Sequence, residues 1–192
     1  CSNRQAIFYQ LQTPGRFNKD HDKSQQLIPM VTKDIRSSLQ NIVFLDPRPQ
    51  QMRDYSHAKI DRLKEDGSNL SSVLYNICTR SGKSDSGKDK TRLLDFVRSL
   101  PEQEITDIQF IKTERDDVMV RLEESFGGAN RIVDAPLLSD GTLRVLAVAA
   151  ALLSAQKGSL VIVEEIDNGV HPSRANQLIH EIEKVAKENE LR

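Results

Sequence analysis

Apolar side chains recur along the chain in two spacings, one typical of α-helices and the other of β-strands. Apolar residues three and four positions apart predict helices over residues 31–40, 70–77, 90–100 and 140–157. Short apolar or alternating runs predict strands over residues 41–45, 105–113, 118–123 and 160–163. The middle two strands are expected to form a hairpin, and Ser68 and Asn69 to cap the second helix. This mixture of helices and strands predicts an α/β fold in which helices flank a sheet.

The segment from residue 140 to 157 carries apolar side chains on every face. A helix of that kind is buried in the middle of a domain, so its polar start must emerge from the core at a defined place. That start is Ser139, Asp140, Gly141 and Thr142. Gly141 has no side chain to block close approach, and the hydroxyls together with the free N–H groups of a helix N-terminus predict a phosphate-binding turn. The simpler alternative is that Ser139 is only an N-cap.

Two carboxylates follow the apolar run at residues 160–163. The run is apolar on both faces, like a central strand of a parallel sheet covered by helices. Glu164 and Glu165 come directly after it, at the end where open α/β sheets bind ligands. Because adjacent strand residues point to opposite sides, we expect one acid to hold Mg²⁺ and the other to act on water as a general base. The alternative is a strand that simply ends in solvent at charged residues.

One further charge lies inside the apolar helix. Arg144 sits one turn from its start, where an unpaired charge is costly. We expect its guanidinium to reach either a nucleotide or a carboxylate such as Glu164, and the sequence leaves both possibilities open.

Composition and charge narrow the possible partners. The 192 residues include 27 Lys and Arg against 28 Asp and Glu, so the formal net charge of -1 gives no global field that attracts nucleic acid or an anionic membrane. Two cysteines and no apolar run of about 18 residues predict a soluble, cytoplasmic protein without membrane contact. The chain starts at Cys1 and stops directly after a helical pattern, so we expect a piece of a longer protein.

Residues 81–89 form a Gly-, Ser- and Lys-rich tract that predicts a surface loop. Gly82, Gly87 and Lys88 have the G-x-x-x-x-G-K spacing of a phosphate-binding P-loop. Asp89 stands where a P-loop has Ser or Thr, and a predicted helix precedes the tract where a P-loop needs a strand. Basic residues around the tract are candidate contacts to DNA or RNA, although a solvated loop is the commoner reason for such a run. These residues are Arg80, Lys83, Lys88, Lys90 and Arg92.

Residues 138–172 resemble the ABC-type head ATPases, most closely the soluble branch that includes the SMC, RecF and OLD-like proteins. LSDGT, residues 138–142, resembles that family's signature motif, usually LSGGQ, and LVIVEEIDNGVHP, residues 160–172, resembles its Walker B strand, catalytic glutamate and D-loop. The resemblance implies that Glu164 lies on the Mg²⁺ side, that Glu165 is the catalytic base and that His171 belongs to the D-loop. His171 as a plain turn residue before Pro172 is the alternative.

The resemblance also implies an architecture, namely a partial P-loop NTPase sheet of the ABC-ATPase type with flanking helices and a mixed helix and β-hairpin insertion. Residues 1–49 would belong to the nucleotide-binding core, and residues 50–132 to the insertion. Residues 133–192 would supply the signature helix, the Walker B strand and the following helix. The sequence contains neither the family's P-loop nor its switch histidine, so we expect this chain alone to hydrolyse ATP negligibly.

The implied function is ATP binding and hydrolysis with Mg²⁺ by a homodimer. In this family the signature motif of one subunit closes over nucleotide that the P-loop of another subunit holds. By association, the parent protein is expected to act in DNA maintenance or phage defence, with DNA or a nuclease or effector protein as a partner. The alternative is a nucleotide-gated scaffold or partner-docking module that does not hydrolyse ATP.

Overall fold

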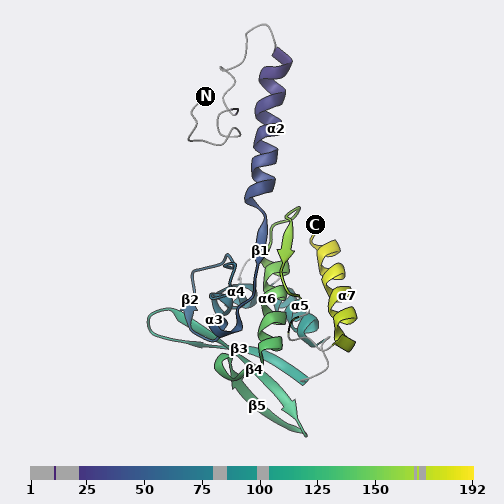
Figure 1. Ribbon diagram of the computed structural model, residues 1–192. Coiled ribbons are helices and arrows are strands. Elements are labelled where there is room, and N and C mark those ends of the chain that lie inside the picture. The colour runs from purple at the N-terminus through teal and green to yellow at the C-terminus, as the bar shows by residue number, and fades with distance from the viewer. Residues whose placement is uncertain (1–10, 12–21, 80–85, 99–103, 167, 169–171) are drawn as a thin grey trace. The chain divides into compact units, whose positions relative to one another are not determined.

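The computed structural model describes residue 11 and residues 22–79, 86–98, 104–166, 168 and 172–192 (Figure 1). His171, Arg80 and Lys83 lie outside the described residues. The chain divides into two compact units, Cys1–Ile42 and Val43–Arg192, and each is described by itself. The domain boundaries at residues 49 and 132 stay predictions.

The smaller unit contains helix α2 (Asp22–Gln40). The sequence predicts a helix only from residue 31, and a proline inside a helix removes one internal hydrogen bond. The helix in fact starts nine residues earlier and runs through Pro29. The helical tendency on both sides of Pro29 therefore outweighs the bond that is lost there.

The larger unit contains two sheets with helices packed around them. Its elements run in the order β1 (Val43–Leu45), α3 (Pro49–Met52), β2 (Ser56–His57), α4 (Leu70–Thr79), α5 (Ser86–Arg98), β3 (Glu104–Lys112), β4 (Asp117–Phe126), β5 (Ala129–Asp134), the 3-10 helix η2 (Ala135–Leu137), α6 (Asp140–Ser154), β6 (Val161–Val163) and α7 (Pro172–Glu188).

One sheet is parallel and the other antiparallel. Strands β1 and β6 pair in parallel, with Val43 opposite Val161 and Leu45 opposite Val163. In the second sheet, β4 lies in the centre, with β3 along one edge and both β2 and β5 along the other. The pairing of β3 with β4 confirms the predicted hairpin. The mixed α/β fold with flanking helices is therefore confirmed, and it suits a P-loop NTPase domain.

Helix α6 is the centre of the larger unit. It contacts α3, α4, α5 and α7 as well as both strands of the parallel sheet, and Figure 1 shows it between α3 and α4 on one side and α5 and α7 on the other. Leu143 and every residue from 145 to 152 are buried. The prediction from its uniform apolarity is confirmed, and the residues that reach the surface lie in its first turns and at its last two positions.

The parallel sheet is less buried than the sequence predicts. Strand β6 has three residues and pairs only with β1 among the residues that the structure describes. Ile162 is 40% exposed, and Phe44 opposite it is 36% exposed, whereas Val161 and Val163 pack against the core. The prediction of a strand buried on both faces is wrong here, because apolarity alone does not say which elements cover a strand.

The Gly-, Ser- and Lys-rich tract is partly helical. Residues 86–89 form the first turn of α5, so the loop prediction is wrong for them, while residues 80–85 are not described. Helix α4 precedes the tract, as the sequence predicts. Gly87 and Lys88 are therefore helical residues and not part of a strand–loop–helix P-loop. In the described segments, no helix combines the length and apolarity that crossing a membrane requires.

Candidate functional site

The two parallel strands end at the same edge of their sheet and bring three acids to it. The backbone N–H of Glu164, the residue after β6, donates to the carbonyl oxygen of Leu45, the last residue of β1, over 2.9 Å. Asp46 directly follows β1 just as Glu164 follows β6. Glu164 and Glu165 are both exposed. Carboxylates at the carboxyl edge of a parallel sheet lie where ligands of open α/β sheets bind.

Glu165 has an unusual backbone conformation. Its φ of 48° lies in the left-handed region, which costs a residue other than glycine about 1–3 kcal/mol. Asn168 holds it there, because its backbone N–H donates to the Glu165 carbonyl over 2.9 Å and its Nδ2 donates to Glu165 Oε2 over 2.8 Å. The strand itself ends at Val163, so the turn, and not the alternation of a strand, sets the direction of Glu165.

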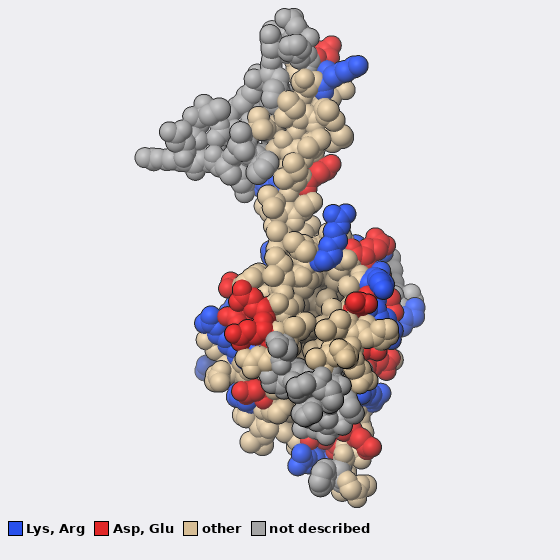
Figure 2. Space-filling view, turned by 45° about the vertical axis from the view of Figure 1, so that its right-hand side comes forward, with Lys and Arg blue, Asp and Glu red and all other residues tan. Residues whose placement is uncertain are grey.

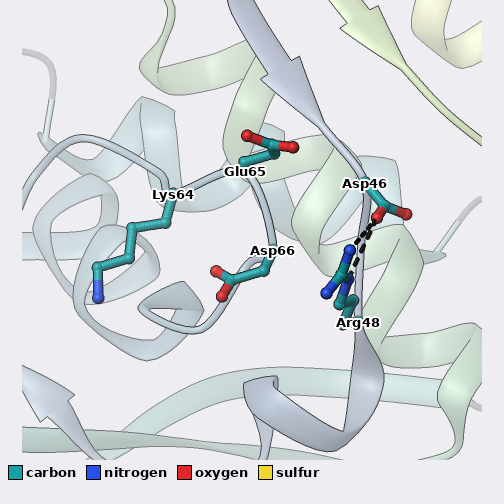
Figure 3. Close-up of a pocket in the computed structure, with 5 residues that line it drawn as sticks. All are labelled: Asp46, Arg48, Lys64, Glu65 and Asp66. Atoms are coloured by element: carbon teal, nitrogen blue, oxygen red, sulfur yellow. Dashed lines mark hydrogen bonds and ion pairs between the residues drawn. The ribbon is translucent and has the colours of Figure 1, made fainter.

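A pocket of about 290 Å³ opens beside this edge (Figure 3). Asp46 and Arg48 line it from the segment after β1, and Lys64, Glu65 and Asp66 line it from the loop before α4. Arg48 donates from Nε and Nη2 to Asp46 Oδ2 over 3.2 and 3.0 Å. Partial burial raises the pKa of Asp66, but hydrogen bonds from the backbone and side chain of Ser68, together with the nearby Lys64, hold that pKa below its usual value. The pocket is lined by acidic and basic side chains.

The polar start of α6 is a capped helix end. Ser139 is the N-cap, and its Oγ accepts a 3.0 Å hydrogen bond from the Thr142 backbone N–H and lies 2.8 Å from Thr142 Oγ1. The first i to i−4 backbone hydrogen bond of the helix runs from the Leu143 N–H to the Ser139 carbonyl oxygen. The capping role of Ser139 is therefore established. The N–H groups of Asp140 and Gly141 come before that bond and are the donors that the first turn presents to an anion.

Arg53, at the end of α3, fixes the segment that leads into this turn. Its Nη1 donates to the carbonyl oxygens of Ala135, Pro136 and Leu138 over 3.3, 3.2 and 2.6 Å. Its Nη2 donates to the carboxylate of Asp140. Sequence reasoning missed Arg53 because these contacts join residues 82 to 87 positions apart and no local pattern marks them. Sequence reasoning also missed Asp46, because the sequence does not show that β1 pairs with β6. The apolar run before Asp46 was the available signal.

Two of the predicted basic contacts, Lys90 and Arg92, are paired with acidic side chains. Lys90 pairs with Asp107 at 2.6 Å, and Arg92 pairs with Glu188 at 2.8 Å. On the face drawn in Figure 2, acidic and basic side chains of the described residues lie interspersed. Arg144 does not pair with Glu164 in the structure, and its Nη1 is buried without a hydrogen-bond partner. These observations give no support to a nucleic-acid surface around α5.

The described residues suit Mg²⁺ only in combination with a nucleotide. Within the parts of the chain that the structure describes, no three His, Cys, Asp or Glu side chains form a metal-binding group. Mg²⁺ bound with a nucleotide needs only one or two carboxylates, because phosphates and water supply the other ligands. The exposed Glu164 carboxylate at the sheet edge meets that requirement.

Comparison with known proteins identifies a family for nearly the whole chain. Residues 16–191 match the family model described as "AAA domain, putative AbiEii toxin, Type IV TA system". No curated protein and no solved structure matches the chain.

Proposed function

The chain belongs to this AbiEii-toxin-like AAA-domain family of P-loop ATPases, and on that premise we propose that it is part of an enzyme that binds and hydrolyses ATP with Mg²⁺. We assign to this chain the closing surface of the site and the base that activates water. The P-loop that grips the triphosphate would come from residues outside this chain. The finer likeness to the SMC, RecF and OLD-like branch belongs to the same proposal.

The conformation of Glu165 is the observation that carries the proposal. A left-handed glutamate costs stability, and such costs persist at functional sites because the surrounding structure enforces them. The Asn168 contacts to Glu165 enforce it here, at the edge of a parallel sheet where nucleotides bind in α/β folds. Asp116 and Glu190 are also left-handed, so it is the combination of this conformation with the place of Glu165 after β6 that supports the proposal.

The chemistry follows from the atoms at this edge. Asn168 donates to Glu165 Oε2 and orients the carboxylate, and in this proposal Oε1 accepts the proton of the attacking water. Glu164 would hold Mg²⁺ through water, and the cation would neutralise charge that develops on the transferred phosphoryl group. The N–H groups of Asp140 and Gly141, at the positive end of α6, would donate to phosphate oxygens.

The two halves of the site are proposed to lie on different subunits. The first turn of α6 would close over nucleotide held by a second copy of the protein, so ATP would drive dimerisation. Because the family description names a type IV toxin–antitoxin system, we assign the ATPase cycle to phage defence, with an effector protein or DNA as a further partner. The D-loop assignment of His171 belongs to the same proposal.

The test is Glu165→Gln in the full-length protein, with Glu114→Gln, an exposed residue of the β3–β4 turn, as the matched control. General-base catalysis contributes about 10²- to 10⁴-fold, so turnover should fall by that factor while ATP binding is retained. Loss of ATP binding in Glu165→Gln would contradict the assigned role. ATP binding without any turnover in the unaltered protein would favour the scaffold alternative. The 192-residue chain alone should show negligible turnover.

A further inference from the structure

We propose that Arg53 is a positioning residue for the phosphate-facing turn, and that it acts by holding the turn's backbone and by neutralising Asp140. The inference rests on the proposed function and extends that function by naming the residue that keeps the first turn of α6 ready for an anion. Arg53 itself touches neither nucleotide nor water in this proposal.

Arg53 is well placed to fix this segment. Arg53 is the residue directly after α3, and Pro49 and Met52 of that helix are buried while α3 packs directly against α6. Its side chain is only 25% exposed. Three carbonyl oxygens of the segment before the turn accept from one guanidinium nitrogen, and the shortest of these bonds, 2.6 Å, is to Leu138, the residue before the N-cap. Loss of Arg53 would release the entry to α6 from α3.

The second part of the role is electrostatic. Asp140 is the first residue of α6, and the helix end favours its negative charge. The same charge would repel a phosphate that approached the N–H groups of Asp140 and Gly141. The guanidinium of Arg53 pairs with this carboxylate, so the turn is close to neutral as it faces an anion. Without Arg53, the turn would be both loose and negatively charged.

The two parts can be separated by a double-mutant cycle on the full-length protein. The variants are Arg53→Ala, Asp140→Asn and the pair of changes together, with Arg115→Ala in the exposed β3–β4 turn as the control. Arg53→Ala should lower kcat by about 10²-fold, the effect of misplacing a group by about 1 Å, with little change in the KM for ATP because the P-loop lies elsewhere. Adding Asp140→Asn should restore about tenfold, since it removes the repelling charge.

A second measurement does not depend on turnover. In the Glu165→Gln background, which should retain ATP, Arg53→Ala should weaken ATP-dependent dimerisation by about 10²-fold in analytical ultracentrifugation. Arg53→Lys should fall between the unaltered protein and Arg53→Ala, because one ammonium cannot reach the carbonyls and the carboxylate together. Arg53→Lys also serves if Arg53→Ala does not fold.

The outcomes distinguish this inference from the proposed function. If turnover does not depend on Glu165 and ATP induces no dimer, the proposed function fails and this inference with it. If both hold and Arg53→Lys or Arg53→Ala matches the Arg115→Ala control, only the role of Arg53 is overturned. If Asp140→Asn restores nothing to Arg53→Ala, the electrostatic part is wrong and Arg53 is only a structural clamp.

Discussion

The ion pair of Glu124 and Arg131 should stabilise the antiparallel sheet more than the other ion pair between β4 and β5 does, that of Arg121 and Asp134. Glu124 on β4 is 2% exposed, and its Oε2 accepts from Arg131 Nε and Nη2 over 3.1 and 2.9 Å, while its Oε1 is buried without a partner. Arg131→Ala would remove two charge-assisted bonds worth about 1.5 kcal/mol each and leave a carboxylate in the core. We expect a loss of about 3 kcal/mol in the free energy of unfolding, the low end of the range for buried pairs because the Arg131 side chain is 59% exposed.

Thermal unfolding followed by circular dichroism measures this loss. For a chain of this size, about 3 kcal/mol corresponds to a fall in Tm of about 6–12 °C. Arg121→Ala is the matched control, because Arg121 pairs with Asp134 across the same two strands but with both side chains partly exposed, and it should cost about 1 kcal/mol or less. Glu124→Met added to Arg131→Ala should recover most of the stability, since no buried charge remains. Equal losses for Arg131→Ala and Arg121→Ala would refute the reasoning.

Two further predictions concern titratable groups. Hydrogen bonds from Ser68 lower the pKa of Asp66 in the folded chain, so the ionised carboxylate of Asp66 stabilises the fold. This stabilisation is fully present above the pKa that Asp66 has in the unfolded chain, and it is lost as the pH falls through the lower pKa of the folded chain. Asp66→Asn should therefore cost about 1 kcal/mol at pH 7 and little at a pH below the folded pKa of Asp66, as urea titrations at both pH values would show, and an equal cost at both would contradict it. Burial raises the pKa of Cys78 to about 12. In a Cys1→Ser variant at pH 8, iodoacetamide should therefore alkylate Cys78 at least about 100-fold more slowly in the native chain than in the urea-unfolded chain. Similar rates in the two states would show that the thiol is accessible.

The elements that could be predicted from the sequence are those whose signal is local and strong. The apolar helix α6, the hairpin of β3 and β4 and the Ser139 cap all follow from residues within one short stretch. Strand β5 and the two-residue strand β2 could not be predicted, because each is defined by pairing with β4 and not by its own composition. Strand β5 is mostly exposed, so no apolar pattern marks it.

Asn69 lies at the start of α4, as the sequence predicts, but its side chain has another role. Its carbonyl oxygen accepts from the Val73 N–H over 3.2 Å, whereas its side chain, in a residue that is 1% exposed, holds the preceding loop. Its Oδ1 accepts from the Lys64 N–H and its Nδ2 donates to the Arg62 carbonyl, each over 2.8 Å. That loop forms one wall of the pocket beside Asp46. The pocket and the Arg53 contacts were beyond sequence reasoning for the same reason, since both join segments that only folding brings together.

The burial of α6 sets how the phosphate-facing turn can move. A helix enclosed by four other helices and two strands cannot slide or tilt without reopening a close-packed core, and such cores switch between discrete arrangements instead of deforming gradually. The turn at Ser139 is therefore not a flexible lid. Any approach of this turn to a nucleotide must therefore move α6 together with the helices and strands packed against it, so the energy of closure would act on that packed core and not on a loop.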